Sequence, residues 1–314
     1  MDMKKQQKGL PAQAGQALLL VLLAMAVLAT MALSVVSRSI SEVSVTTREE
    51  ESLRAFSAAE AGVEEGLITG TPQEVATATT PIPISRDLEV TAPSGTSVVS
   101  SFNAGVERYP LNLQAYIYPF ELLSGQAASV SFVTRDEDGD ILPCGGSAPC
   151  FGGNSLTLCW GDPDNTSQTP AVVANIIFRD GSGNFGTAST GFDPDSTRRG
   201  VVGFGGAPPN NFNAPTGGSC PITEQSYSYT TNIDFAGLGI TGTPVLMRVA
   251  MFYNDTEPHI FGISTTSNLP VQGRRVSSEG VAGEVTRQID AFLLNPEMPF
   301  IFDAALYSSG DIAK

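Results

Sequence analysis

The most apolar part of the chain lies near its N-terminus. Residues 9–37 carry no charged side chain, and residues 17–36 are Ala, Leu, Val and Met interrupted only by Thr30 and Ser34. Globular proteins rarely contain a helix that is apolar on every side. At 1.5 Å per residue, these 20 residues span about 30 Å, the thickness of the hydrocarbon core of a bilayer. The pattern therefore predicts a transmembrane helix over residues 17–36.

The helical pattern continues beyond the apolar run. Between Gln16 and Ala61 the chain has neither Pro nor Gly, the two residues that interrupt helices most strongly. After the run, most apolar residues fall on one stripe of a helix, with charged residues available for the other face. The residues on this stripe are Ile40, Val43, Leu53, Phe56, Val63 and Leu67. Gly66, Gly70 and Pro72 then provide a stop, so we expect one helix over residues 16–68.

The rest of the chain alternates short β-like runs with turn residues. Runs of alternating or β-branched residues lie between Gly, Pro, Asn and Asp, a pattern typical of an all-β sandwich. The runs are Leu111–Ile117, Ala128–Thr134, Ser155–Trp160, Ala171–Phe178, Tyr227–Phe235, Val245–Tyr253 and Ile260–Ser264. Val276–Phe292, interrupted by Gly280 and Gly283, predicts a hairpin.

These patterns together predict an α+β protein with five segments. A basic leader over residues 1–15 is followed by the long helix over 16–68. A Thr-, Pro- and Ser-rich linker or loose first strand occupies 69–101. We expect an antiparallel, sandwich-like β domain over 102–298, and an apolar tail over 299–314 that must be buried somewhere.

Charge is distributed unevenly along the 314 residues. The chain has 17 Lys and Arg against 32 Asp and Glu, a net charge of −15. Lys4, Lys5 and Lys8 precede the apolar run, so a short basic segment is followed by a large acidic body. An acidic body argues against nucleic-acid binding, which requires a basic surface. The single histidine, His259, excludes any site that needs two histidines.

Four cysteines lie in the β-rich body, and they favour disulfide bonds. An even number of cysteines in an extracytoplasmic domain suggests a disulfide framework, for which four residues allow three pairings. We favour Cys144–Cys150, which closes a Gly- and Pro-containing loop, and Cys159–Cys220, which staples a long insertion. The rival interpretation is a four-thiolate zinc site, although the spacing lacks the close ligand pairs of a zinc ribbon.

One acidic segment resembles half of a calcium-binding loop. Asp136, Asp138 and Asp140 place carboxylates at alternate positions, and Gly139 suits the turn. The bidentate Glu expected at position twelve is missing, because Ser147 stands there. The alternative is that Asp and Gly simply form a turn. Calcium is therefore a candidate ligand, and no cofactor is required.

The sequence gives no support for an enzyme. Residues 181–186 match the glycine spacing of a dinucleotide-binding loop, but Thr, Ala, Ser and Gly follow instead of a helix, so the phosphate site cannot form. The chain contains no Gly-x-Ser-x-Gly, no phosphate-binding Walker loop and no pair of metal-binding histidines. The arginine pairs at 198–199 and 274–275 could contact a partner or DNA, but the acidic surroundings favour solvated loops.

Two segments of the predicted helix carry a family resemblance. Gly15-Gln16-Ala17-Leu18-Leu19-Leu20 resembles the class III signal of type IV pilins and pseudopilins. Residues 54–64, with the sequence Ala58-Ala59-Glu60-Ala61-Gly62 at their centre, resemble the end of the first helix of PilX-type minor pilins. The resemblance covers about the first 68 residues. Major pilins carry a Glu five residues after the cut, and here that position is Leu20.

The resemblance implies processing and assembly rather than catalysis. A prepilin peptidase would cut between Gly15 and Gln16, although Lys8-Gly9 offers a second candidate position. The absence of the Glu points to a minor pilin or a tip pseudopilin of a type IV pilus-like or type II secretion-like filament. The implied partners are other pilin subunits, the peptidase and an inner-membrane assembly platform. The implied location is a single-pass membrane protein with an extracytoplasmic body that reaches the cell surface after assembly.

Two other interpretations remain open at the level of sequence. The first is a permanently membrane-anchored extracellular binding module, an adhesin or a carbohydrate-binding domain, in which Trp160 and loop aromatics supply stacking contacts. The second is a secreted domain released by signal peptidase, although the apolar run exceeds the usual 7–15 residues of such a signal.

Overall fold

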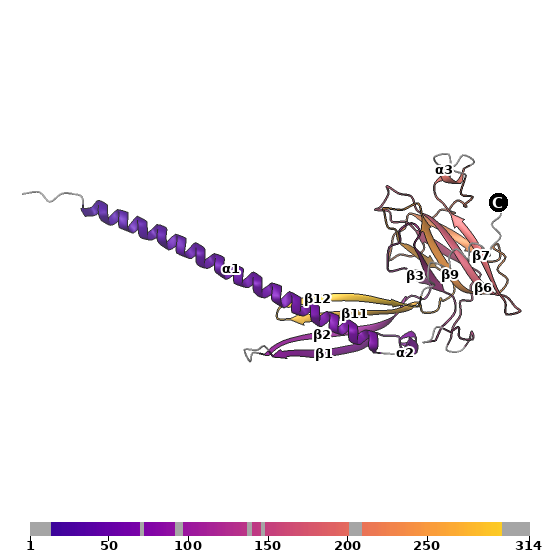
Figure 1. The fold of residues 1–314 in the computed structure, drawn as a ribbon, viewed down its shortest axis with the longest axis horizontal. Helices are drawn as coiled ribbons and strands as arrows, with labels where there is room; N and C mark the ends of the chain where they lie inside the picture. The colour runs from indigo at the N-terminus through magenta and orange to yellow at the C-terminus, as the bar shows by residue number, and fades with distance from the viewer. Residues whose placement is uncertain are drawn as a thin grey trace, which may run out of the picture.

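The computed structural model describes residues 14–69, 72–91, 97–136, 140–145, 148–200 and 209–296, and all structural statements concern these ranges. Figure 1 shows a long helix that leads into a β-rich body. This arrangement confirms the predicted α+β class. The elements in chain order are α1 (Ala14–Ile68), α2 (Pro72–Thr77), β1 (Ile82–Thr91), β2 (Ser97–Tyr109), β3 (Ala115–Ile117), β4 (Ala127–Ser131), β5 (Ser155–Trp160), β6 (Ala171–Arg179), β7 (Phe185–Phe192), α3 (Ser196–Arg199), β8 (Tyr229–Asp234), β9 (Thr243–Phe252), β10 (Phe261–Ser264), β11 (Gly273–Ala282) and β12 (Val285–Leu294).

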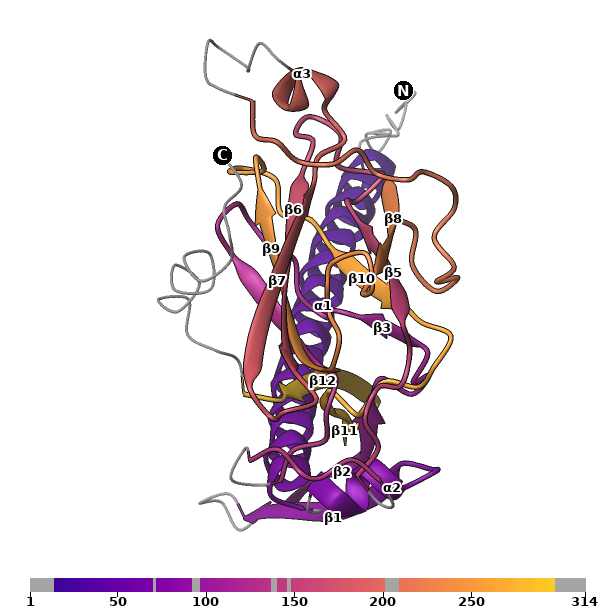
Figure 2. The ribbon, with the colours of Figure 1, turned by 90° about the vertical axis from the view of Figure 1, so that its right-hand side faces the viewer.

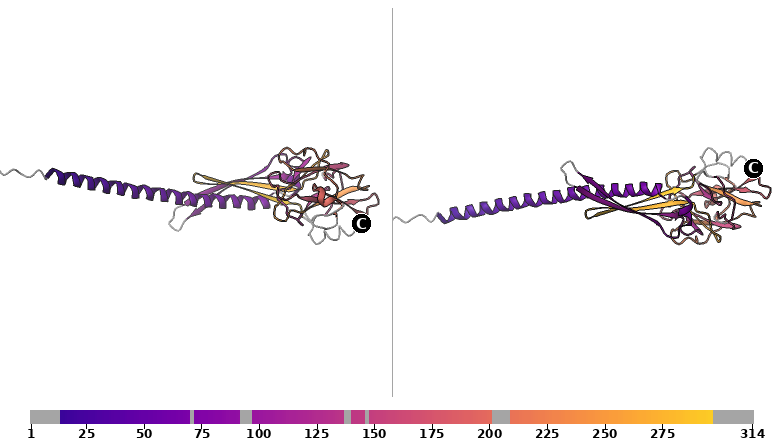
Figure 3. Two further views of the ribbon diagram at one scale, coloured as in Figure 1. Left: turned by 90° about the horizontal axis from the view of Figure 1, so that it is seen from above. Right: turned by 90° about the horizontal axis from the view of Figure 1, so that it is seen from below.

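Helix α1 is a single continuous helix, as the sequence predicts. Its 55 residues correspond to a length of about 82 Å. The N-terminal half projects away from the body, and the C-terminal half lies along a β-sheet (Figures 1 and 3). The helix ends before Pro72, where Arg274 Nη2 donates a hydrogen bond of 2.7 Å to the carbonyl oxygen of Leu67. This bond satisfies one of the carbonyl groups that a helix C-terminus leaves without a partner.

A four-stranded antiparallel sheet supports the C-terminal half of α1. Its strand order is β1-β2-β11-β12, and we call it the cradle sheet. Residues 69–101, which the sequence assigns to a linker or loose first strand, contain α2, β1 and the beginning of β2. The predicted boundary at residue 102 therefore falls inside β2. The cradle sheet and the sandwich are two separate layers of structure, where the sequence analysis expects one domain.

The remaining strands form a β-sandwich of two four-stranded sheets. One sheet has the order β3-β10-β5-β8, and the other has the order β4-β9-β6-β7; we call them the β5 sheet and the β6 sheet. Both contribute apolar side chains to one shared core, as expected for two sheets that pack face to face. Its largest fully buried members include Trp160, Tyr116, Phe132, Phe261, Met247 and Met251.

Aromatic side chains join the cradle sheet to the sandwich. Tyr109, the last residue of β2, packs edge-to-face on Phe292 of β12 and on Tyr116 of β3, with ring centroids 4.9 and 5.8 Å apart. Buried aromatic pairs of this kind add stability beyond their buried area. Figure 2, viewed along the molecule from the sandwich end, shows the sandwich strands in front of the long helix α1.

Candidate functional site

The N-terminal half of α1 is covered by no part of the described chain. The large apolar side chains from Leu18 to Val36 are between 45% and 69% exposed. This helix is long and apolar enough to cross a membrane. The first charged residues along the described helix, Arg38 and Glu42, form an exposed ion pair of 3.0 Å. An apolar surface of this size requires lipid or other protein chains to cover it.

The C-terminal half of α1 meets the cradle sheet through very small residues. Ala55, Ala58 and Ala59 are buried against it. Opposite them lies Gly280 of β11, where an added Cβ would stand 2.0 Å from the Ala55 carbonyl oxygen and 2.4 Å from the Ala59 nitrogen. Glycine in a strand commonly marks such a close approach of another backbone. We call this contact between α1 and β11 the seam.

The seam continues towards the end of the helix with two glycines of α1. An added Cβ at Gly62 would lie 2.7 Å from the Phe102 ring, and one at Gly66 would lie 2.4 Å from Val276 Cγ1. Glycine destabilises a helix interior, so its presence here is explained by packing rather than by helix formation. The seam therefore accounts for the composition of residues 58–62, in which Glu60 alone is exposed and charged.

Polar contacts flank the seam along the helix. Arg86 of β1 pairs with Glu65 at 2.6 Å, and Arg287 of β12 donates to Ser52 Oγ at 3.0 and 2.7 Å. These contacts join both edge strands of the cradle sheet to α1. The long helix with the exposed apolar half is thus anchored in the body over several turns.

The predicted processing residues lie at the beginning of α1. Gly15 and Gln16 fall within its first turn, since the helix begins at Ala14. Residues 1–13, which include most of the predicted leader, lie outside the described residues. Leu20, which stands where major pilins carry a Glu, is exposed.

Both disulfide bonds join the cysteine pairs that the sequence favours. Cys144 bonds Cys150 within one loop, and Cys159 of β5 bonds Cys220 across 61 residues of sequence. The second bond holds the segment before β8 over the outer face of the β5 sheet. There, the Tyr227 hydroxyl and Ile222 come so close to Gly262 that a Cβ at this glycine would lie 2.3 and 2.7 Å from them.

In the acidic loop around residue 138, the Asp136 carboxylate stabilises a turn. Asp136 Oδ1 accepts a hydrogen bond of 2.8 Å from the Asp140 backbone N–H. Asp138 lies outside the described residues, so the set of three predicted calcium ligands is not placed. Among the described residues, no group of three or more metal-ligating acidic, Cys or His side chains is found.

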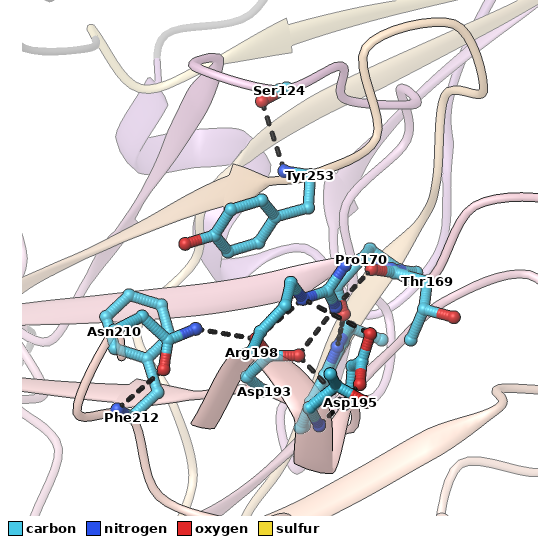
Figure 4. Close-up of polar contacts among 11 residues, drawn as sticks. Ser124, Thr169, Pro170, Asp193, Asp195, Arg198, Asn210, Phe212 and Tyr253 are labelled. Carbon is cyan, nitrogen blue, oxygen red and sulfur yellow. Dashed lines mark hydrogen bonds and ion pairs between the residues drawn. The ribbon is translucent and has the colours of Figure 1, made fainter. Parts of the chain in front are cut away.

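A second acidic loop, at the far end of the sandwich, forms a buried ion-pair cluster (Figure 4). The Asp193 carboxylate is fully buried and accepts hydrogen bonds from Arg198 Nη2 and Asn210 Nδ2, each at 2.6 Å, and from Arg198 Nε at 2.8 Å. The Arg198 guanidinium also lies 4.4 Å from the Tyr253 ring centroid. Arg198 therefore fastens a loop of its own chain, where the sequence analysis considered it for contact with a partner.

The second arginine pair is also used within the chain. Arg275 lies on the cradle sheet between Glu107 and Asp290, with nitrogen–oxygen distances of 3.5 and 3.1 Å. Its neighbour Arg274 bonds the end of α1, as described above. Arg274 and Arg275 therefore both make contacts within their own chain.

The single histidine is buried between two loops of the sandwich. His259 Nδ1 accepts a hydrogen bond of 3.1 Å from the Asp162 backbone N–H. Burial lowers the pKa of His259, although the Gln168 backbone carbonyl and the carboxylates of Glu257, Asp162 and Glu121 act in the opposite direction. The imidazole is therefore neutral at pH 7 and has a structural role.

We expect the protein to lose stability between pH 7.5 and pH 5.5 because of His259. Its folded pKa lies below the unfolded value of about 6.5, so the unfolded state binds the proton first as the pH falls. The stabilisation is complete above pH 6.5 and is lost as the pH falls through the folded pKa. The carboxylates with lowered pKa values, Asp180, Asp195, Glu257 and Asp290, titrate below this window. Melting temperatures at both pH values test this.

The matched variant is His259→Asn, whose side-chain oxygen can accept the same hydrogen bond but does not titrate. We expect a smaller fall in melting temperature in this variant than in the unchanged protein. An equal fall in both would assign the pH dependence to other groups.

One aromatic residue considered for stacking on a carbohydrate, Trp160, lies in the core. Trp160 is completely buried, and its Nε1 donates to the Pro170 carbonyl oxygen at 3.0 Å. It therefore presents no stacking surface, which corrects its assignment to a binding role. The glycine-rich segment 181–186 covers the turn between β6 and β7 and the first two residues of β7. In this turn, Asp180 Oδ1 accepts hydrogen bonds from the backbone N–H groups of Ser182 and Asn184. No protein-family model matches the chain, and no curated protein matches it.

Proposed function

We propose that this protein is a minor pilin or pseudopilin, a structural subunit of a type IV pilus-like or type II secretion-like filament. The observation that supports this most is the division of α1 into two halves. The N-terminal half is apolar on all sides and bare, whereas the C-terminal half is built into the body through the seam. During filament assembly, such a subunit replaces the lipid around its apolar half by neighbouring helices. Its other half must stay attached to the body throughout.

The bare half of α1 carries residues suited to packing against other helices. Small side chains allow helix backbones to approach closely in an apolar environment, where the hydrophobic effect gives no drive for association. The small residues of this half are Ala24, Ala26, Ala29, Ala32 and Ser34. Other pilin subunits are the partners we propose for this surface, after delivery by an inner-membrane assembly platform.

The continuity of α1 favours retention of the apolar segment in the mature protein. A secretory signal peptide is removed as a separate segment, but here the apolar run and the seam belong to one uninterrupted helix. The two disulfide bonds suit an oxidising, extracytoplasmic compartment for the body. We propose a single-pass membrane protein that reaches the cell surface within a filament.

Processing by a prepilin peptidase tests this proposal. We expect coexpression with such a peptidase to shorten the chain by the first 15 residues, so that it begins with Gln16. The variant Gly15→Val should remain uncut, because the peptidase requires the small residue before the cut. Intact mass and N-terminal sequencing give the result. An unshortened chain, or a Gly15→Val chain processed as before, would favour a permanently membrane-anchored binding module instead.

A further inference from the structure

Loops from both sheets of the sandwich meet at the ion-pair cluster of Asp193 and Arg198 (Figure 4). Arg198 follows β7, and its Nη2 donates a hydrogen bond of 2.8 Å to the Thr169 carbonyl oxygen, in the loop between β5 and β6. Its guanidinium also lies on Tyr253, in the loop between β9 and β10. The Tyr253 backbone N–H donates to Ser124 Oγ at 3.2 Å, in the loop between β3 and β4. Four loops are thus joined at one end of the sandwich, where proteins of this architecture often present their binding residues.

Tyr253 has a backbone conformation that bulky residues rarely adopt. Its φ angle is 65°, in the left-handed region where glycine, asparagine and aspartate occur far more often. Its N–H is held by Ser124, and the next residue, Asn254, is completely buried. Asn254 Nδ2 donates to the carbonyl oxygens of Leu122 and Glu257 at 2.8 and 3.1 Å. The surrounding structure therefore imposes this conformation on a tyrosine, and residues held against their own preference cluster at binding and catalytic sites.

The Tyr253 ring is presented to solvent on a rigid support. The residue is 42% exposed, and the Arg198 guanidinium lies 4.4 Å from the ring centroid, where its positive charge attracts the ring. Arg198 is fixed in turn by the buried Asp193 carboxylate, which accepts hydrogen bonds from two of its nitrogens. In Figure 4 the Tyr253 hydroxyl points away from the cluster and takes part in none of the marked contacts. A ring that is already fixed loses little conformational entropy when a ligand binds to it.

Arg198 supports the ring and is not free to bind an anion. The carboxylates of Asp193 and Asp195 lie 2.6 and 3.8 Å from its nitrogens, so its charge is compensated within the chain. Asp255, two residues after Tyr253, is exposed and adds negative charge to the same loop. Like charges that face each other across an interface cost binding energy. The site therefore favours a neutral ligand over an acidic one.

The surroundings of the ring fit a sugar better than a protein partner. Aromatic hot spots in protein interfaces lie at the centre of a larger, well-packed patch. Here, the exposed residues that follow Tyr253 or precede Arg198 in their loops are polar: Asp255, Thr256, Ser196 and Thr197. A sugar ring has an apolar face of C–H groups and a rim of hydroxyl groups. It can therefore stack on one aromatic side chain while carboxylates and hydroxyls form hydrogen bonds with its rim.

We propose that Tyr253 is a stacking platform for a neutral sugar, with the carboxylate and hydroxyl groups of the joined loops bonding the sugar hydroxyls. The cluster of Asp193 and Arg198 is then the support that positions the ring. The sequence analysis considered Trp160 for stacking, and Tyr253 takes its place as an exposed ring. The inference goes beyond filament assembly, because it rests on the sandwich loops and not on α1.

Binding to a glycan array tests this inference with the full-length protein, in a detergent that has no sugar headgroup. The array carries neutral and sialylated oligosaccharides. We expect the protein to be retained on a neutral oligosaccharide, and Tyr253→Asn to bind that oligosaccharide about tenfold more weakly. Asparagine tolerates the left-handed backbone, so this variant removes the ring without forcing the loop to rearrange. Tyr253→Phe keeps the ring and should retain most of the binding.

The matched control is Phe185→Ala. Phe185 is an exposed aromatic residue at the opposite end of the sandwich, in the first position of β7, and its loss should leave binding unchanged. The near-UV circular dichroism of buried Trp160 shows whether each variant keeps its fold. Retention on no neutral oligosaccharide would overturn the proposal. So would equal binding by the Tyr253→Asn and unchanged proteins, or a preference for the sialylated oligosaccharides.

Discussion

Replacing Gly280 with alanine is expected to destabilise the protein by about 3 kcal/mol, near the upper end of the range for overpacked sites. The added methyl group would meet the backbone of α1, at Ala55 and Ala59, and not the end of a flexible side chain. Backbone atoms of a helix cannot move aside individually, so α1 must shift away from β11. The seam on both sides of this point would then lose its close contact.

The matched control is Gly181→Ala. Gly181 lies in the turn between β6 and β7, where an added Cβ has no atom within 4 Å and the backbone is not left-handed. We expect this variant to unfold like the unchanged protein. Urea denaturation measures both variants, and trypsin cleavage at Arg54 reports whether α1 has left the cradle sheet. Equal stability of the two variants would show that the seam is not tightly packed.

Removal of the Cys159–Cys220 bond is expected to have the largest effect of any pair substitution. The bond closes 61 residues, and in the chain-entropy description a loop of this length contributes about 4 kcal/mol. The Cys144–Cys150 bond closes only six residues and contributes about 2 kcal/mol on the same basis. Cys159 is also completely buried, so its replacement must be small and apolar.

Two double variants compare the bonds directly. Cys159→Ala with Cys220→Ala should lower the urea midpoint about twice as much as Cys144→Ala with Cys150→Ala. The first variant should also expose Tyr227, because its segment is no longer held over Gly262. A larger loss from the short loop would contradict the assignment of the long disulfide as the main covalent support of the sandwich.

The long helix and most sandwich strands could be predicted from the sequence because their signals are local. The helix has a long stretch without Pro or Gly, and β5 matches its predicted range Ser155–Trp160. The disulfide pairing followed from loop length and the position of strands. For the helix, the strands and the Cys144–Cys150 bond, the residues that carry the signal lie close together in the chain.

One part of the cradle sheet, the hairpin predicted over Val276–Phe292, is present as strands β11 and β12. The placement of β2 beside β11 could not be predicted in the same way, because these strands are distant in sequence. Strand β2 pairs with β11, about 170 residues later, and β1 has many polar residues because only one face meets the helix. The sequence analysis interpreted Gly280 as an interruption of a hairpin. In the structure it lies within β11, and its lack of a side chain admits the helix. Strand β7 was missed because glycine and small polar residues weaken its pattern.

The sequence predicted those parts of the candidate site that depend on composition alone and not on how the chain packs. The bare helix follows directly from composition, whereas the internal use of Arg198 depends on Asp193 and Asn210 lying beside it. Burial of Trp160 is likewise a property of the folded arrangement. The contacts of Arg198 and the burial of Trp160 could therefore not be predicted from the spacing of residues along the chain.

The most direct test of the account follows the bare half of α1 in the cells that make this protein. Sheared surface filaments and membranes are collected separately, and the N-terminal sequence of this chain is determined in each. If this protein is a minor pilin or pseudopilin, we expect the filament fraction to contain a chain that begins with Gln16 and retains the whole apolar run. A chain found only in membranes and still beginning with Met1 would contradict it.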